Sequence, residues 1–146
     1  MSIKYTLEQT INQPIDKVVE LMENPDNFKE WQPGFISLEH ISGEPGQVGS
    51  KSKLKYDMGK RQVEMIETIT KRNLPHEFDL TFDADKVYNI QNNRFEKIDE
   101  NTTKWITENE FRLTGYMKIF DFFGKGMFKK QSQIYLDKFK EFAEKS

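Results

Sequence analysis

A long apolar stripe runs through residues 115–145, which read GYMKIFDFFGKGMFKKQSQIYLDKFKEFAEK. At helical spacing the apolar side chains fall on one broad face, and charged side chains fill the opposite face. The sequence therefore predicts a long amphipathic helix, about 45 Å in length at about 1.5 Å per residue. Such a helix needs a wide apolar surface, which a twisted antiparallel sheet would provide. The predicted face comprises Phe120, Phe123, Met127, Gln131, Ile134 and Phe142, with Phe128, Tyr135 and Phe139 beside them.

Gly124 and Gly126 interrupt this stripe. Each glycine weakens a helix by about 1 kcal/mol relative to alanine. One interpretation is a local kink, or a helix that begins only at Met127. The other is a gap left where a bound molecule or another backbone comes close.

The composition suits one folded domain over residues 1–146, long enough to bury a core. Aromatic residues make up 13% of the chain while alanine occurs only twice, so large flat rings fill the interior and a cavity is permitted. The net charge is −2 and the two signs are interspersed. Charge therefore offers no case for binding nucleic acid or an anionic membrane.

The chain has no cysteine, which excludes disulfides, thiolate nucleophiles and cysteine-based metal sites. The first residues lack the basic and apolar regions of an export signal, and no window approaches the roughly 18 apolar residues of a spanning helix. We therefore expect a soluble, cytoplasmic protein with no integral membrane segment.

Apolar and polar residues alternate from Ile3 to Ile11, which predicts a strand. Pro14 and Asp16 are typical of the start of a short helix. A second short helical turn is predicted around Phe28 and Trp31. Short turns then separate six further strands, which predicts an antiparallel meander. These strands are expected at 35–42, 50–58, 61–71, 76–83, 86–97 and 102–113.

This order of elements resembles the START-like (SRPBCC) superfamily, in particular its bacterial polyketide cyclase/dehydrase and lipid-transport branch, which is related in fold to the Bet v 1 plant allergens. The resemblance covers nearly the whole chain, but its motifs are structural in kind. They are Pro14-Ile15-Asp16-Lys17-Val18-Val19, Asn24-Pro25 to Trp31-Gln32-Pro33-Gly34, Gly43-Glu44-Pro45-Gly46-Gln47-Val48-Gly49-Ser50, Glu67-Thr68-Ile69-Thr70 followed by Pro75, and Asn101-Thr102-Thr103.

The resemblance implies an α+β helix-grip fold, in which a seven-stranded antiparallel sheet wraps around a long C-terminal helix and two short helices follow strand 1. It also implies a largely apolar cavity between sheet and helix. Members bind lipids, sterols, polyketides, quinones or plant hormones, and some cyclise or dehydrate polyketide chains. No catalytic residue is carried over from the family.

Two other features resemble a phosphate-binding loop and a metal site, but for each we expect a purely structural role. The glycine-rich stretch from Gly43 to Gly49 lacks the spacing of a phosphate-binding loop and joins two strands, so we expect a hairpin loop. His40 and His76 lie on different predicted strands without a cluster of ligands around them. We therefore expect no metal site, no cofactor and no hydrolytic activity.

Polar residues occupy positions on two predicted strands where the alternation of inward and outward side chains predicts apolar ones. If Val87 and Phe95 face the interior, the three amides between them at the same parity face it too. Burying such groups unpaired costs about 1–3 kcal/mol each, so water, one another or the polar end of a ligand should satisfy them. The alternative is that Tyr88 and Ile90 face inward. The polar set is Asn89, Gln91 and Asn93, with Thr107 and Asn109 from the last strand.

Glu67 shares parity with Met65 and Ile69 and is the one acidic candidate for the interior. A buried carboxyl with a raised pKa can act as an acid or base. A salt-bridged or rim carboxylate is the more ordinary interpretation.

These observations predict a protein that binds a small hydrophobic or amphipathic molecule, such as a lipid, polyketide or quinone-like compound. Two alternatives are a polyketide cyclase/dehydratase-type enzyme and an interaction module like the co-chaperone branch of the fold, although no protein partner is indicated. A buried acid–base pair would favour the enzyme, and a filled cavity with an exposed apolar patch would favour the module. The expected apolar walls are Tyr56, Met65, Phe78, Leu80, Phe82, Trp105, Phe111, Phe120, Phe123, Met127 and Tyr135.

Overall fold

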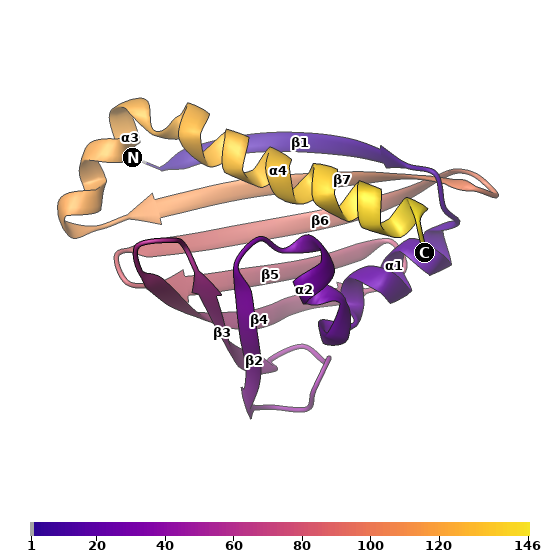
Figure 1. Cartoon of the computed structure of the whole chain (residues 1–146), viewed down its shortest axis with the longest axis horizontal. Helices are drawn as coiled ribbons and strands as arrows, with labels where there is room; N and C mark the ends of the chain where they lie inside the picture. The colour runs from indigo at the N-terminus through magenta and orange to yellow at the C-terminus, as the bar shows by residue number, and fades with distance from the viewer. Residues whose placement is uncertain (1) are drawn as a thin grey trace.

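A computed structural model describes residues 2–146 as one curved sheet with helices on its concave side (Figure 1). The strands match the predicted positions to within two or three residues. The strands are β1 (Ile3–Ile11), β2 (Phe35–Ser42), β3 (Lys51–Asp57), β4 (Gln62–Asn73), β5 (Glu77–Ala84), β6 (Val87–Asp99) and β7 (Thr102–Leu113). The α-helices are α1 (Ile15–Glu23), α2 (Phe28–Trp31), α3 (Phe120–Phe123) and α4 (Lys125–Glu144), and the 3-10 helices are η1 (Pro25–Asn27) and η2 (Gly115–Ile119).

The sheet has the order β1-β7-β6-β5-β4-β3-β2, and every neighbouring pair is antiparallel. Strands β2 to β7 form the predicted meander. The pairing of β1 with β7 is long in range, with Ile3 opposite Phe111 and Ile11 opposite Thr103. This pairing places the first strand beside the last and leaves β2 at the other edge. The fold is therefore the helix-grip fold that the sequence predicts.

The C-terminal segment is shorter and more broken than predicted. It is not one helix from Gly115 but η2, α3 and then α4, and the 20 residues of α4 span about 30 Å. The interruption lies at Gly124, whose amide donates to the carbonyl of Phe120 at 2.7 Å. A Cβ at Gly124 would lie 2.6 Å from that carbonyl oxygen, which belongs to the preceding turn of the same segment and leaves no room for a side chain. A Cβ at Gly126 would meet no heavy atom within 4 Å, so the space there is open.

The helical face that packs on the sheet also differs from the predicted one. In α4 the buried side chains are Leu136, Phe139 and Ala143, whereas Met127 and Ile134 are exposed. Phe120, Gly124 and Phe128 follow one another at four-residue spacing and all turn inward, and the amides of Gly124 and Phe128 each bond to the carbonyl four residues earlier. The observed inward face is therefore rotated from the predicted one.

Helix α4 is fixed along one side of the sheet. The Tyr5 hydroxyl of β1 donates to the carbonyl of Phe128 at 3.0 Å and shares a 2.6 Å hydrogen bond with the Ser132 hydroxyl. Phe139 is fully buried, with its ring centroid 5.0 Å from Trp31 and 5.6 Å from Trp105. Helix α4 thus packs on β1, α1 and α2 and crosses the β1–β7 side of the sheet, while the concave face of β3 to β5 has no long helix over it (Figure 1).

Candidate ligand-binding cavity

Inward side chains form rows across the concave face. In one row Glu67 of β4 lies opposite Phe82 of β5, which lies opposite Asn89 of β6. Two residues along, Leu80 of β5 lies opposite Gln91 of β6. Because neighbouring strands are about 4.8 Å apart, Glu67 and Asn89 are separated by about 10 Å, with a phenyl ring between them. The face therefore has a carboxyl on one side and amides on the other.

The amides lie on the concave face, as one interpretation of the strand parity predicted. Asn93 is 2% exposed and is the centre of the cluster. Its side-chain oxygen accepts from Trp105 Nε1 at 3.0 Å, and its Nδ2 donates to the Phe78 carbonyl at 3.0 Å and to Gln91 Oε1 at 3.1 Å. The alternative, with Tyr88 and Ile90 facing inward, is wrong.

The remaining members of the cluster also bond to one another. Asn109 Oδ1 accepts from Gln91 Nε2 at 3.3 Å and from Asn89 Nδ2 at 3.4 Å, and Asn109 Nδ2 donates to Thr107 Oγ1 at 3.1 Å. Asn89 Nδ2 further donates to the Glu110 carbonyl at 3.1 Å. The network therefore needs no ligand to satisfy most of its groups. Within residues 2–146, no group donates to Asn89 Oδ1, and Gln91 stays half-buried, so these two face the hollow with bonding capacity.

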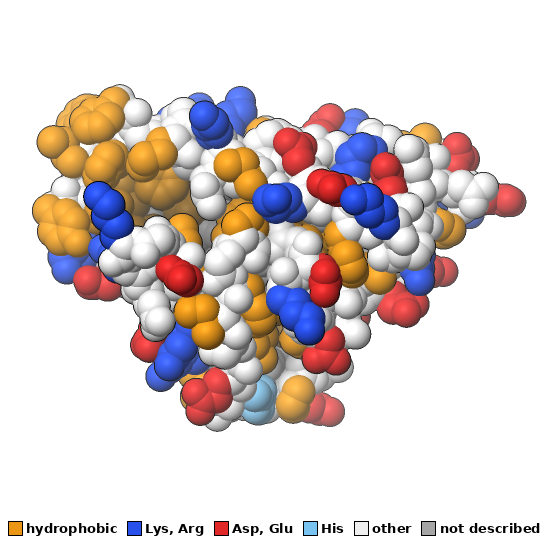
Figure 2. All heavy atoms as spheres, viewed as in Figure 1, with side chains coloured by type: hydrophobic (Ala, Val, Ile, Leu, Met, Phe, Trp, Pro, Cys, Tyr) orange, Lys and Arg blue, Asp and Glu red, His pale blue; other side chains and the backbone are white. Residues whose placement is uncertain are grey.

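The concave face of β4 to β6 is not sealed. Several large side chains point inward there and yet are only half-buried, among them Met65, Phe78 and Phe82. Side chains in a filled core would be excluded from solvent. Figure 2 shows a hollow bordered by hydrophobic side chains on this side of the molecule. We therefore take the hollow over this face, between α4 and strands β3 to β6, as the candidate ligand cavity.

Glu67 faces this cavity and forms no ion pair or side-chain hydrogen bond with residues 2–146. Burial away from water raises the pKa of its carboxyl from 4.5 to about 7. Burial also raises the pKa of the Tyr56 phenol, to which the neighbouring Tyr135 and Glu67 add smaller effects. The Tyr56 hydroxyl donates to Gln32 Oε1 at 2.6 Å. Burial raises the pKa of Tyr135 as well. A carboxyl and two phenols therefore lie close together at this side of the cavity.

The other predicted wall residues divide into three groups. Tyr56, Leu80 and Trp105 are buried. Phe123 and Met127 are 65% and 53% exposed, so their assignment to the cavity wall is wrong, because they lie beside the helical face on which Phe120 and Phe128 turn inward. The half-buried group on or beside the cavity comprises Met65, Phe78, Phe82, Phe111, Phe120 and Tyr135.

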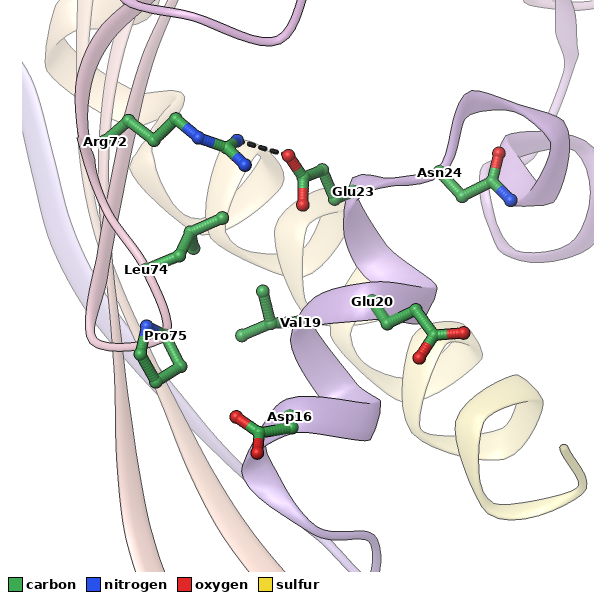
Figure 3. A pocket seen from close by; sticks show the side chains of 8 residues that line it. All are labelled: Asp16, Val19, Glu20, Glu23, Asn24, Arg72, Leu74 and Pro75. Atoms are coloured by element: carbon green, nitrogen blue, oxygen red, sulfur yellow. Dashed lines mark hydrogen bonds and ion pairs between the residues drawn. The ribbon is translucent and has the colours of Figure 1, made fainter.

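A second concavity, which the sequence did not predict, lies outside the sheet-helix interior. It is an open groove of about 500 Å³ between α1 and the β4–β5 turn. Arg72 pairs with Glu23 across it, and Val19 and Leu74 face each other below that pair (Figure 3). The groove is open to water and mixed in charge, so it would desolvate a ligand poorly. The cavity on the concave face is the better candidate. The groove is lined by Asp16, Val19, Glu20, Glu23, Asn24, Arg72, Leu74 and Pro75.

Two buried side-chain atoms of residues 2–146, Trp31 Nε1 and Asp121 Oδ1, have no hydrogen-bond partner. Trp31 is 8% exposed, and its Nε1 is buried without an acceptor in the described part of the chain. A single tryptophan at a helix turn gives no sequence signal for such an unpaired donor. The position of Nε1 depends entirely on how α2 packs on α4.

Neither histidine belongs to the cavity. His40 and His76 are both exposed, on β2 and at the β4–β5 turn. Across residues 2–146 no three histidine, aspartate or glutamate side chains come together as metal ligands would. The Gly43–Gly49 stretch connects β2 to β3 as a hairpin loop.

A seven-stranded antiparallel sheet around a C-terminal helix, with inward side chains left unsealed, defines a helix-grip protein of the START-like superfamily. Comparison with family models places the chain more narrowly. Residues 2–144 match the model for polyketide cyclase/dehydrase and lipid transport proteins, and the chain belongs to that family.

Solved structures share the fold at low sequence identity. Ara h 8.0201 is 15% identical with a TM-score of 0.80, and the match covers 100% of both chains. The Zhui aromatase/cyclase from Streptomyces sp. R1128 is 14% identical with a TM-score of 0.79, over 99% of this chain and 94% of that one. Norcoclaurine synthase from Thalictrum flavum, in complex with dopamine and hydroxybenzaldehyde, is 14% identical with a TM-score of 0.70, over 97% and 86%. Among curated protein sequences, none matches this chain.

None of the helices formed by residues 2–146 combines the length and the apolar character needed to cross a bilayer.

Proposed function

We propose that the protein binds a small amphipathic molecule in the cavity between α4 and strands β3 to β6. The observation that carries this proposal is the half-burial of inward-facing Met65, Phe78 and Phe82. These side chains present apolar surface to an unfilled space, and covering it with a ligand contributes about 25 cal/mol per Å² removed from water. The family's description, polyketide cyclase/dehydrase and lipid transport, supports a ligand of this kind.

The polar groups specify what kind of molecule would fit. Asn89 and Gln91 offer an acceptor and a donor on one side, and Glu67 offers a carboxyl about 10 Å away on the other. Phe82 lies between them. A flat or chain-like molecule with a carbonyl or hydroxyl at each end would meet polar partners at both ends and an aromatic ring in the middle.

The first test is native mass spectrometry of freshly purified protein, followed by titration with the apolar fluorophore N-phenyl-1-naphthylamine. Phe82→Trp places a larger ring in the cavity and should weaken fluorophore binding at least fivefold, since overfilling an occupied space costs about 1 kcal/mol or more. Asp83→Trp adds the same ring one position along β5, on the outer face, and should leave binding unchanged. Equal affinities for both variants, with no molecule carried through purification, would contradict the proposal.

An enzymatic role is the second candidate, and Glu67 is the observation that favours it. With its pKa near 7, this carboxyl exchanges a proton readily at neutral pH, as a general acid or base must. Next to Tyr56 and Tyr135 it could take a proton from the carbon beside a ketone and return one to the resulting alkoxide. An intramolecular aldol addition would form one C–C bond, and dehydration would then release one water.

This second role is tested by incubating the protein with a short poly-β-ketone and following loss of water by mass spectrometry. If Glu67 acts as the base, Glu67→Gln should lower the rate by about a hundredfold or more. Fluorophore binding should persist in that variant, because the amide keeps the size of the side chain. Turnover that is unchanged in Glu67→Gln would leave the protein as a binding protein only.

A further inference from the structure

The segment from η2 to the start of α4 exposes an unusual amount of apolar surface. Phe122 is 83% exposed, Phe123 65%, Tyr116 65%, Ile119 58% and Met127 53%. They occur within 12 consecutive positions, and Figure 2 shows hydrophobic side chains gathered over η2 and α3 at one end of the molecule. Single exposed apolar residues are ordinary, but a contiguous group of large ones marks an interaction surface.

The same segment is basic although the chain as a whole is not. Residues 115–130 contain four lysines and one acid, Asp121, in a chain whose net charge is −2. Lys118, Lys125, Lys129 and Lys130 are exposed, and no ion pair joins any of them to a described acid. The even mixture of charges inferred from the whole sequence therefore does not hold at this end. We refer to the five exposed apolar residues and these four lysines as the basic apolar end.

We propose that the basic apolar end docks onto the surface of a bilayer that contains anionic phospholipids. Exposed aromatic and aliphatic side chains interleaved with unpaired lysines are the composition of segments that lie in a membrane interface. The apolar side chains would enter the boundary of the acyl chains, and the lysines would remain at the phosphate groups. Tyr116 already carries a cation on its ring, since Lys86 Nζ lies 5.1 Å from the ring centroid.

A second copy of the chain fits this surface less well. A twofold contact would bring the same patch of both copies together, and with it eight unpaired lysine charges where the segment offers one acid per copy. Like charges at short range oppose such a contact, whereas an anionic bilayer neutralises them. The charge of the segment therefore favours lipid over self-association.

The position of the patch fits access to the cavity. The hollow seen in Figure 2 opens next to the hydrophobic cluster over η2 and α3, and Phe120, two positions before Phe122, packs against the core. Docking through this end would bring the mouth of the cavity to the membrane surface. The docking proposal does not depend on what the cavity holds.

The test is co-sedimentation of the purified protein with vesicles of phosphatidylcholine alone, or with a third of that lipid replaced by phosphatidylglycerol. The protein should bind the mixed vesicles more tightly, and added salt should weaken that binding. Phe122→Ser should weaken binding at least tenfold, since burying a phenylalanine contributes about 1.5 kcal/mol or more. Lys125→Gln with Lys129→Gln should weaken it roughly thirtyfold, at about 1 kcal/mol per lysine.

Matched controls lie at the opposite end of the sheet (Figure 1), where Ile98 is 55% exposed beside the exposed Lys97. Ile98→Ser and Lys97→Gln should leave vesicle binding unchanged. Absence of binding to mixed vesicles, or binding that none of the variants at the basic apolar end alters, would overturn the proposal. So would a lipid-free dimer in sedimentation equilibrium that Phe122→Ser dissociates, because the surface would then be a contact between copies. The Phe82→Trp variant should still bind vesicles, which would show that membrane docking does not require an intact cavity.

Discussion

Replacing Asn93 by leucine tests whether the amide cluster stabilises the fold by itself. The side chain of Asn93 is 2% exposed and makes three hydrogen bonds, one of them accepted from Trp105 Nε1 at 3.0 Å. Trp105 is 3% exposed, so water cannot replace the lost acceptor. An indole N–H buried without a partner costs about 1–3 kcal/mol, and the Phe78 carbonyl loses a donor as well.

Leucine has the same branched shape and avoids the cost of burying an amide, which offsets part of this loss. We expect Asn93→Leu to lower the free energy of unfolding by about 2–3 kcal/mol. For a chain of this length that corresponds to a drop in Tm of roughly 6–10 °C, measured by circular dichroism. Asn92→Leu is the matched control, because Asn92 is an exposed amide on the next position of the same strand, and it should change stability by less than about 0.5 kcal/mol.

A double-mutant cycle separates the lost hydrogen bond from any packing effect. Trp105→Phe removes the donor, so Asn93→Leu should cost about 1–2 kcal/mol less in that background than in the wild type. The reasoning is refuted if Asn93→Leu costs the same in both backgrounds, or if its effect on Tm is no larger than that of Asn92→Leu.

The remaining predictions concern Glu67 and the two glycines at the start of α4. Because the folded-state pKa of Glu67 is about 7 against an ordinary 4.5, the folded protein binds the extra proton, and stability should fall by up to about 3 kcal/mol as pH rises from about 4.5 to about 7. Glu67→Gln should remove that loss in Tm measured against pH, and parallel curves for the two proteins would contradict the pKa. Gly124→Ala should destabilise by about 1–3 kcal/mol, because its Cβ would lie 2.6 Å from the Phe120 carbonyl oxygen. Gly126→Ala, with no atom within 4 Å, should stabilise α4 by about 0.5–1 kcal/mol in urea unfolding, and equal effects at the two glycines would show that the close approach at Gly124 is unimportant.

Much of the fold could be predicted from local patterns. Alternation between Ile3 and Ile11 and the short turns after Phe35 identified every strand, because the period of two is a property of the extended backbone itself. The same parity placed Asn93 and Glu67 on the concave face. That half of the candidate site was accessible from the sequence, since alternate residues on one strand share their orientation whatever packs against them.

The helical face was predicted less well than the strands. Apolar residues lie on several sides of the segment from Tyr116 to Phe128, so their spacing does not determine which side meets the sheet, and Phe123 and Met127 turn outward while Phe120 turns inward. Nothing local reveals that turn, because it depends on Phe120 packing against the core while Phe122 does not. The exposed apolar surface at η2 and α3 was therefore not predicted, because the sequence analysis assigned these residues to one buried stripe.

The satisfaction of the amides was equally a matter of tertiary structure. The sequence placed three amides on the inner face of one strand and left open whether water, one another or a ligand would satisfy them. Trp105 Nε1 and Asn109 reach them from β7, by hydrogen bonds of 3.0 Å and 3.3–3.4 Å, because the register of β6 against β7 puts Phe95 opposite Trp105 and Gln91 opposite Asn109. A period along one strand determines the direction of a side chain, whereas its partners depend on which strands pair and in which register.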